Sequence, residues 1–307
     1  MKLWDCFPFN AELDLLELRL HELDSVVDRF VLVEADRTFT GVAKPLHFAA
    51  NAGRFAAFRD RIVHIVVTDM PCGPDPWVRE SFQRNAIVRG LDGLGDGDIV
   101  LISDVDEIPR RDAVAEVRRG RHAVTGLRMP LFYFRFNFLN VARAVHTARL
   151  IAIRGRGFRS AQEARELRAG FENLYRRCCK LLTAPPAIPH AGWHFSYLGD
   201  ESFVANKLRA YAHAADPDHA GVLDRLDIEG MIDDRRDLFG HAGFRWEVVR
   251  VDDYFPPYVL ANRQRFAHLI APEGIARMDD FGKLMKREAS EIFHTWEGLA
   301  RRWPLLR

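Results

Sequence analysis

Apolar residues in the first third of the chain recur at helical spacing in two segments. Residues 10–24, NAELDLLELRLHELD, carry an apolar residue at every third or fourth position, as on one face of a helix. The residues of this face are Leu13, Leu16, Leu20 and Leu23. Asn10 stands where a helix cap is expected. A second helix is predicted over residues 77–91, WVRESFQRNAIVRGL.

Short runs of uninterrupted apolar residues lie between and after these helices. They are RFVLVEA at 29–35, RIVHIVVTD at 61–69 and IVLIS at 99–103. Continuous rather than alternating apolar strands are typical of a parallel sheet that is covered on both faces. The order helix, strand, strand, helix, strand therefore predicts an α/β fold, in which helices cover both faces of a mostly parallel, Rossmann-like sheet.

The second half of the chain begins with an alternating aromatic pattern. Residues 128–140, RMPLFYFRFNFLN, place phenylalanines at every second position, which predicts one strand with an aromatic face. We interpret these residues as core: Phe132, Phe134, Phe136 and Phe138. Two more strands are predicted at 146–154 and 192–198.

Helical patterns fill most of the remaining second half. Their positions are the stretch around Lys207 and Arg209, residues 222–237, part of 255–270, and the tail 278–307 with its basic end. The sequence shows no internal repeat, low-complexity segment or clear linker. One large domain is therefore expected to occupy most of the chain.

Composition and charge narrow the class of protein. Of 307 residues, 48% are hydrophobic and 28% are charged, as is ordinary for a folded globular chain. Lys and Arg number 44 and Asp and Glu number 43, so the basic excess that a nucleic-acid partner requires is missing. No run reaches the ~18 apolar residues of a transmembrane helix, and the N-terminus does not read as a secretory signal.

The four cysteines agree with a reducing compartment. Cys6, Cys72, Cys178 and Cys179 show neither C-x-x-C spacing nor the density of a disulfide framework. We interpret them as free thiols, and we expect a cytoplasmic location.

One segment joins a buried strand to a cluster of acids. In DGDIVLISDVDEIPRR, residues 96–111, the strand runs directly into Asp104, Asp106 and Glu107. Side chains two residues apart in extended backbone point the same way, so Asp104 and Asp106 would repel each other without a cation. Mg²⁺ or Mn²⁺ suits two carboxylates and often keeps substrate phosphates in its other positions. The alternative is a helix start, with Asp104 as cap and the other two acids in the first turn.

Two enzyme classes place acids after a buried strand in this way. In nucleotide-sugar transferases a D-x-D motif holds a metal on the diphosphate, whereas in haloacid-dehalogenase-like phosphatases the first Asp, here Asp104, is the nucleophile. The phosphatase motif requires Thr or Val where Ile108 stands, and usually lies on the first strand of its domain. It is therefore the minor alternative, beside a non-catalytic module that binds nucleotide or glycan. Phosphate-loop, G-x-S-x-G and dinucleotide-binding motifs are absent from the sequence.

Several segments, in order along residues 5–265, resemble glycosyltransferase family 17. The most specific are FNAELDLLELRLHELDSVVDRFVLVEADRTFTGVAKPLHF (9–48) and ISDVDEIP (102–109); the others are RESFQRNAI (79–87), AGWHFSYL (191–198) and NKLRAY (206–211). The resemblance implies a GT-A fold with a smaller acceptor-side sheet, and inverting transfer from UDP-N-acetylglucosamine with a divalent ion. We expect this ion to be Mn²⁺ or Mg²⁺, with Mn²⁺ favoured. It implies a nucleotide-binding half at 1–110, an acceptor half at 111–270 and a helical extension at 271–307. The resemblance does not identify the acceptor, which we expect to be a glycan or another hydroxyl compound.

Five further residues are candidates for the donor site beside Asp104. Glu34 ends an apolar run and is a candidate contact for uracil or ribose. Arg79 and Arg84 carry planar guanidinium groups that suit a diphosphate. Asn85 and Lys207 complete the donor set, Lys207 by offsetting charge on the leaving diphosphate. The alternatives are a strand-end acid for Glu34 and solvated side chains for the arginines and the lysine.

The metal and the catalytic base have candidates in the second half. His194, in GWHFS, is the expected third metal ligand beside Asp104 and Asp106, because a neutral imidazole binds Mn²⁺ without adding negative charge. A structural histidine is the alternative. Inverting transfer needs a base for the proton of the acceptor hydroxyl, and the candidates are Asp200, Glu201 and Glu107.

Overall fold

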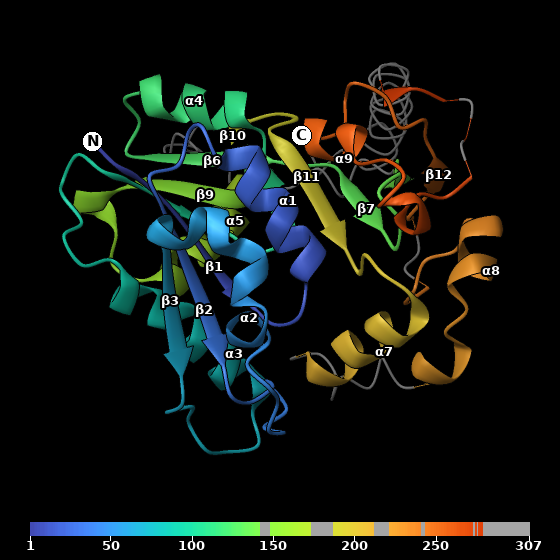
Figure 1. The fold of residues 1–307 in the computed structure, drawn as a ribbon, viewed down its shortest axis with the longest axis horizontal. Coiled ribbons are helices and arrows are strands. Elements are labelled where there is room, and N and C mark those ends of the chain that lie inside the picture. The colour runs from blue at the N-terminus through green and yellow to red at the C-terminus, as the bar shows by residue number, and fades with distance from the viewer. Residues whose placement is uncertain are drawn as a thin grey trace, which may run out of the picture.

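The computed structural model describes residues 1–141, 148–172, 187–211, 221–240, 243–272, 274 and 276–278 of the chain. These residues form two β-sheets with helices packed around them (Figure 1). In the view of Figure 1 the larger sheet lies on the left and the smaller sheet on the right. The two sheets come from interleaved stretches of sequence rather than from two successive halves.

The larger sheet has seven strands in the order β10-β6-β9-β4-β1-β2-β3. They are β1 (Leu3–Phe9), β2 (Arg29–Ala35), β3 (Ile62–Val67), β4 (Ile99–Ile102), β6 (Val124–Arg128), β9 (Ala148–Arg154) and β10 (Ala187–Ile188). β1 pairs in parallel with β2 and β4, β2 pairs in parallel with β3, and β9 is antiparallel to β4 and β6. The carboxyl ends of β1, β2 and β4 therefore share one edge, where open α/β sheets bind ligands.

Helices cover both faces of this sheet because side chains along each strand alternate between the faces. One face packs against α1 (Leu13–Leu23), α2 (His47–Ala50), the 3-10 helix Ala52–Arg61 and α4 (Arg111–Arg119). The other face packs against α3 (Pro76–Asn85), the 3-10 helix Ala86–Gly90 and α5 (Ala161–Glu172). The predicted α/β, GT-A-like fold class is confirmed, with a mostly parallel sheet and helices on both faces.

The smaller sheet has five strands in the order β12-β8-β7-β11-β5. They are β5 (Glu107–Pro109), β7 (Leu131–Tyr133), β8 (Phe138–Asn140), β11 (Gly192–Ser196) and β12 (Trp246–Val248). Beside this sheet lie α7 (Glu201–Ala210), α8 (Ile228–Asp233) and α9 (Pro257–Ala261), as Figure 1 shows. Only residues 103–106 separate β4 of the larger sheet from β5 of the smaller one, so the acidic cluster lies where the sheets meet.

The prediction of one aromatic strand over residues 128–140 is wrong. The chain forms β7 and β8 there, with a turn between them in which Phe134 adopts a left-handed backbone conformation, φ 59°. All four phenylalanines are buried, but Phe132 and Phe136 belong to one core cluster and Phe134 and Phe138 to another. The period of two therefore reflects side chains that alternate between two core clusters, not one face of a single strand.

Several further elements were not predicted from the sequence, among them the short strands β5, β6, β10 and β12. β1, the middle strand of the parallel group, was not predicted, because Asp5 interrupts its apolar pattern. Helices α4 and α5 were not predicted either. Asn10 does not cap α1: the N-cap residue is Glu12, whose carboxylate accepts hydrogen bonds from the backbone N–H groups of Asn10 and Ala11.

The remaining expectations concern the termini, membranes and cysteines. Within the described part of the chain no helix is both long and apolar enough to cross a bilayer. Cys6 is a buried free thiol and Cys72 an exposed one, while Cys178 and Cys179 lie outside the described residues. The predicted tail helix, from residue 279 onward, also lies outside them, and the division at residues 110 and 270 stays a prediction.

Candidate active site

A cavity of about 380 Å³ opens at the shared edge of β1, β2 and β4. Its polar wall includes the acidic cluster, and residues that follow β1 and β2 complete that side. Its other wall comes from β7, β11, α7 and the segments beyond them. Of the eleven predicted site residues, six line the cavity: Arg84, Asp104, Asp106, Glu107, His194 and Lys207. The fold therefore brings predicted site residues from both halves of the chain into one cavity.

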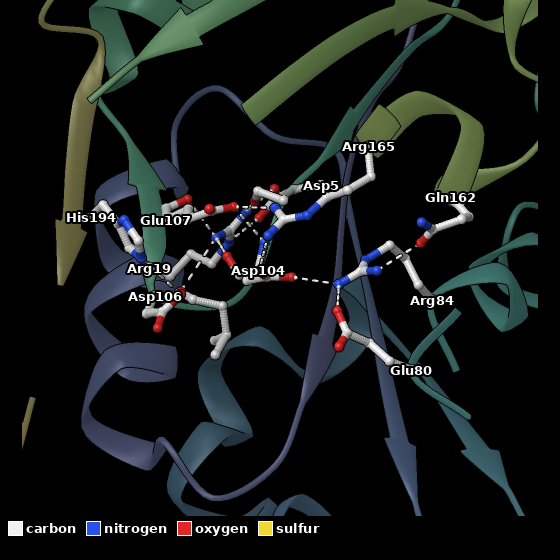
Figure 2. Close-up of polar contacts among 12 residues, drawn as sticks. Asp5, Arg19, Glu80, Arg84, Asp104, Asp106, Glu107, Gln162, Arg165 and His194 are labelled. Atoms are coloured by element: carbon white, nitrogen blue, oxygen red, sulfur yellow. Dashed lines mark hydrogen bonds and ion pairs between the residues drawn. The ribbon is translucent and has the colours of Figure 1, made fainter. Parts of the chain in front are cut away.

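Cations of the protein face the carboxylates of the acidic cluster (Figure 2). Arg165 of α5 forms an ion pair with Asp104 Oδ2, and its Nη1 lies 2.8 Å from Glu107 Oε2. Arg84 Nη2 approaches Asp104 Oδ1 at 3.3 Å. Glu107 Oε2 also accepts a hydrogen bond of 2.8 Å from the backbone N–H of Asp104. Asp104 and Glu107 are thus tied to each other and to Arg165.

A fully buried ion pair supports the cluster from inside the fold. Arg19 of α1 donates to both carboxylate oxygens of Asp5 on β1, at 2.7 and 2.6 Å, and neither side chain is exposed. The same guanidinium donates to the backbone carbonyls of Asp104, at 3.0 Å, and Glu107, at 2.9 Å. Because one rigid group binds both the central strand and the loop backbone, it fixes the path of the chain from β4 to β5.

Lys207 of α7 reaches the cluster from the second half of the chain. Its Nζ lies 2.8 Å from Asp106 Oδ2 and 3.1 Å from Glu12 Oε1. Burial raises the pKa of Asp106 to about 6, the charges of Asp104 and Glu107 act in the same direction, and Lys207 opposes them. Burial acts to lower the pKa of Lys207, but Asp106 and Glu12 outweigh it and raise that pKa well above its ordinary value. The ammonium is therefore charged at neutral pH.

His194 lies beside Asp106 on the wall of the cavity. Its Nε2 is 3.8 Å from Asp106 Oδ1, so the two atoms would have to approach by under ~1 Å to be neighbouring ligands of one octahedral ion. Among the described residues no group of three or more His, Cys, Asp or Glu side chains is arranged to hold a metal, since Asp104 faces its arginines. Mg²⁺-type sites commonly use one or two carboxylates and complete the shell with substrate phosphates and water. The donor set of Asp106 and His194, with Asp104 nearby, therefore fits a divalent ion that is shared with a ligand.

Aromatic side chains form much of the opposite wall. They are Tyr133, Tyr197, Tyr211, Phe239 and Phe244. The rings of Tyr133 and Tyr197 meet edge to face with centroids 5.5 Å apart. Burial raises the pKa of Tyr211 to about 12, so its hydroxyl keeps its proton. A wall of aromatic faces and protonated hydroxyls suits a sugar, which presents both C–H groups and hydroxyls.

Five predicted site residues are absent from the described lining of the cavity, and each contacts the fold instead. Glu34 is fully buried and accepts hydrogen bonds from the backbone of Phe48 and from His64. Arg79 donates to the backbone carbonyls of Phe39 and Gly73.

The other three act at helix starts. Asn85 accepts a hydrogen bond of 2.9 Å from the backbone N–H of Gln162 at the start of α5. Asp200 caps α7 by accepting from the backbone N–H of Phe203 at 2.8 Å, and Glu201 accepts from that of Ile228 at 3.3 Å. These contacts position neighbouring elements, and the predicted ligand and base roles of these residues stay predictions.

Sequence reasoning missed several charged residues of this site. Arg37, Lys44 and Glu80 line the cavity, and three others contact the acidic cluster or Lys207. Of these three, Arg165 and Glu12 also line the cavity, and Arg19 lies directly beneath the acidic cluster. For Arg165 a signal existed, because SAQEARELR begins with a serine cap and continues with strong helix formers; Ser160 Oγ accepts a hydrogen bond from the backbone N–H of Glu163. For Arg19 the signal was a charged residue among the leucines of a helix that was expected to be buried on one face.

Comparison with solved structures gives distant similarities. A mannosyltransferase from Pyrobaculum calidifontis, PcManGT, in complex with GDP-Man and Mn²⁺, is 12% identical over 99% of this chain and 81% of its own, with a TM-score of 0.40. The galactosyltransferase LgtC, in complex with donor and acceptor sugar analogs, is 12% identical over 89% of this chain and 98% of its own, with a TM-score of 0.32. Both TM-scores are low, so the description of the fold rests on the sheet topology and not on these similarities.

Sequence comparison is more specific. The human beta-1,4-mannosyl-glycoprotein 4-beta-N-acetylglucosaminyltransferase is 26% identical over 291 residues, which cover 85% of this chain and 53% of the human one. The same enzyme from Rattus norvegicus is 25% identical over 288 residues, with the same coverage. This chain thus spans about half the length of these relatives. The family model of glycosyltransferase family 17 matches residues 1–243, and the chain therefore belongs to that family, as the resemblance predicted.

Proposed function

We propose that this chain transfers a sugar from a nucleotide diphosphate donor to a hydroxyl acceptor, with inversion and with the help of a divalent ion. The supporting observation is the cavity at the carboxyl ends of the parallel strands, where Asp104 and Asp106 meet Arg84, Arg165 and Lys207. Carboxylates for an ion and cations for phosphate oxygens are the two groups that a diphosphate requires. From the names of its relatives we propose UDP-N-acetylglucosamine as the donor and a glycan as the acceptor.

The protein's own side chains divide the work in this proposal. Asp106 and His194 would hold the ion, with Asp104 as a further oxygen ligand. When bound, such an ion supplies a positive charge that stabilises the diphosphate as it leaves. Lys207 and Arg84 bind diphosphate oxygens, and their positions on different halves of the fold orient the donor in the cavity.

The acceptor sugar occupies the aromatic wall in this proposal. Tyr133, Tyr197 and Tyr211 would stack on its C–H faces and donate hydrogen bonds to its hydroxyls. Of the three acids predicted as base, only Glu107 lines the cavity, and it is bound to Arg165 and to the backbone of Asp104. We therefore assign Glu107 to holding the loop rather than to taking the proton.

Calorimetry and product analysis test this function together. We expect UDP to bind with Mn²⁺ and to bind much more weakly with a chelator, because the ion joins carboxylate to diphosphate. GDP and GDP-mannose serve as comparison ligands, and the Asp106→Asn variant should lose the contribution of the ion. Incubation with UDP-N-acetylglucosamine and acceptor sugars should release UDP and give the inverted anomer, which NMR detects.

Two outcomes would contradict the proposal. UDP affinity that is equal with ion and with chelator would remove the metal-bridged donor. UDP binding with neither transfer nor donor hydrolysis for any acceptor would instead support a non-catalytic binding module.

A further inference from the structure

Arg165 enters the acidic cluster from a firmly held helix. Its helix, α5, begins with a hydrogen bond from the backbone N–H of Gln162 to Asn85 Oδ1, and Ala161 and Ala164 are buried against the larger sheet. The side chain of Gln162 in turn accepts a hydrogen bond of 2.7 Å from Arg84 Nη1. The first turn of α5, from which Arg165 extends, is therefore held in place by the fold.

The two carboxylates that Arg165 bridges differ in their freedom. Glu107 is 1% exposed and is fixed by the backbone N–H of Asp104 as well as by Arg165 Nη1. Asp104 is 31% exposed and faces the cavity, with Arg165 and Arg84 on its two oxygens (Figure 2). A ligand can therefore reach Asp104 and displace Arg165 from it, while Glu107 still holds the other end of the guanidinium.

We propose that Arg165 is a donor-binding residue that, in the free protein, acts as the resident counter-ion of Asp104. In the free protein it neutralises Asp104 and keeps the acidic loop in place. When the donor binds, Arg165 releases Asp104, pivots on Glu107 and donates its freed N–H groups to the diphosphate. This inference rests on the proposed function, because it takes the diphosphate as the anion that enters the cavity.

The proposal predicts that removing the charge of Arg165 strengthens ion binding but weakens nucleotide binding. In the free protein Arg165 competes with any divalent ion for Asp104, so its removal should strengthen ion binding. In the donor complex Arg165 supplies charge-assisted hydrogen bonds, so its removal should weaken nucleotide binding. A residue that only stabilised the loop would weaken both, because a disordered loop presents neither carboxylates nor cations.

The experiment uses the full chain with Arg165→Met, which keeps the length of the side chain but removes its charge. Mn²⁺ binding to the nucleotide-free protein is measured from the EPR signal of the free ion, and UDP binding at saturating Mn²⁺ by calorimetry. We expect Mn²⁺ to bind roughly three- to tenfold more tightly and UDP roughly ten- to a hundredfold more weakly. Arg159→Met removes the same charge from an exposed position just before α5 and should change neither value.

A second variant guards against a misfolded protein. Arg165→Lys keeps the positive charge but cannot bridge two carboxylates, so both effects should keep their sign and become smaller. Unchanged or weaker Mn²⁺ binding by Arg165→Met, with a melting temperature near that of the wild type, would overturn the inference even if UDP binds normally to the wild type. Failure of the wild-type protein to bind UDP at all would overturn the proposed function, and with it the donor half of the inference.

Discussion

Lys207 Nζ lies 2.8 Å from Asp106 Oδ2, although the two residues are 101 positions apart in the chain. The same ammonium reaches Glu12 Oε1 at 3.1 Å, at the start of α1. Lys207 thus joins the start of α1, the acidic cluster and α7 of the second half. The pair is nearly buried, with 17% of the lysine and 8% of the aspartate side chain exposed. Lys207 therefore contributes both to stability and to the geometry of the site.

Lys207→Met should destabilise the protein and also disturb the site. Removing one partner of a fully buried ion pair typically costs about 3–5 kcal/mol; because Lys207 faces the cavity, we expect roughly 2 kcal/mol. Urea unfolding measures this loss, and Arg209→Met on the exposed side of α7 is the matched control. If the variant and its control unfold at the same urea concentration, the Lys207 pairs add no stability.

His194→Gln should change the ion preference of the site. An imidazole nitrogen favours Mn²⁺ over Mg²⁺, whereas an amide oxygen does not, so we expect the Mn²⁺ preference to fall several-fold. Thermal shifts with UDP and either ion give the comparison. His122→Gln, at an exposed position, is the control. An unchanged preference in His194→Gln would leave this histidine with a structural role only.

Gly192→Ala should weaken the contact between the acidic loop and the smaller sheet. Gly192 pairs with Pro109 of β5, and a Cβ atom there would overlap the carbonyl oxygen of Ile108. Such overpacking against backbone typically costs about 1–3 kcal/mol, and β11 would have to shift together with His194. Gly53→Ala, where no atom lies within 4 Å of the added Cβ, is the control and should stay within about 0.5 kcal/mol. Both values come from urea unfolding, and equal stabilities would refute the predicted overlap.

Glu17 should make stability depend on pH in strong acid. Burial disfavours its charge, but hydrogen bonds from Arg265, Tyr258 and Arg54 outweigh this and lower the pKa of Glu17 to about 2. The unfolded value is about 4.3, so this stabilisation is complete above pH ~4.3 and is lost as the pH falls towards 2. We expect it to contribute about 1–2 kcal/mol, after allowance for the partial exposure of the arginines.

Unfolding of Glu17→Gln from pH 5 to pH 2 tests this dependence. Its free energy of unfolding should be lower than that of the wild type at pH 5 and should fall less steeply towards acid. Glu116→Gln, which removes a carboxylate from an exposed position of α4, should keep the wild-type slope. A wild-type slope in Glu17→Gln would show that the arginine contacts do not hold in solution.

The sequence by itself determined the parallel core and the acidic cluster at its edge. β2 and β4 were predictable because they are buried on both sides and so read as unbroken apolar runs. β3 is a partly buried edge strand, and its run of β-branched residues made it predictable. The placing of Asp104 and Asp106 at a ligand-binding edge followed from that, because the edge is a property of every open parallel sheet.

Only the tertiary structure decided which charges surround the cluster. Arg165 and Lys207 lie 61 and 101 positions from their aspartates, and no local pattern encodes such a distance. Asp5 hid the central strand β1 because a lone acid in an apolar run reads as an interruption, and its partner Arg19 is supplied by another element. A buried charge is tolerated only when a partner of opposite charge lies close in space. Such a residue interrupts the apolar pattern of its own strand or helix, while the partner that stabilises it comes from a distant part of the sequence.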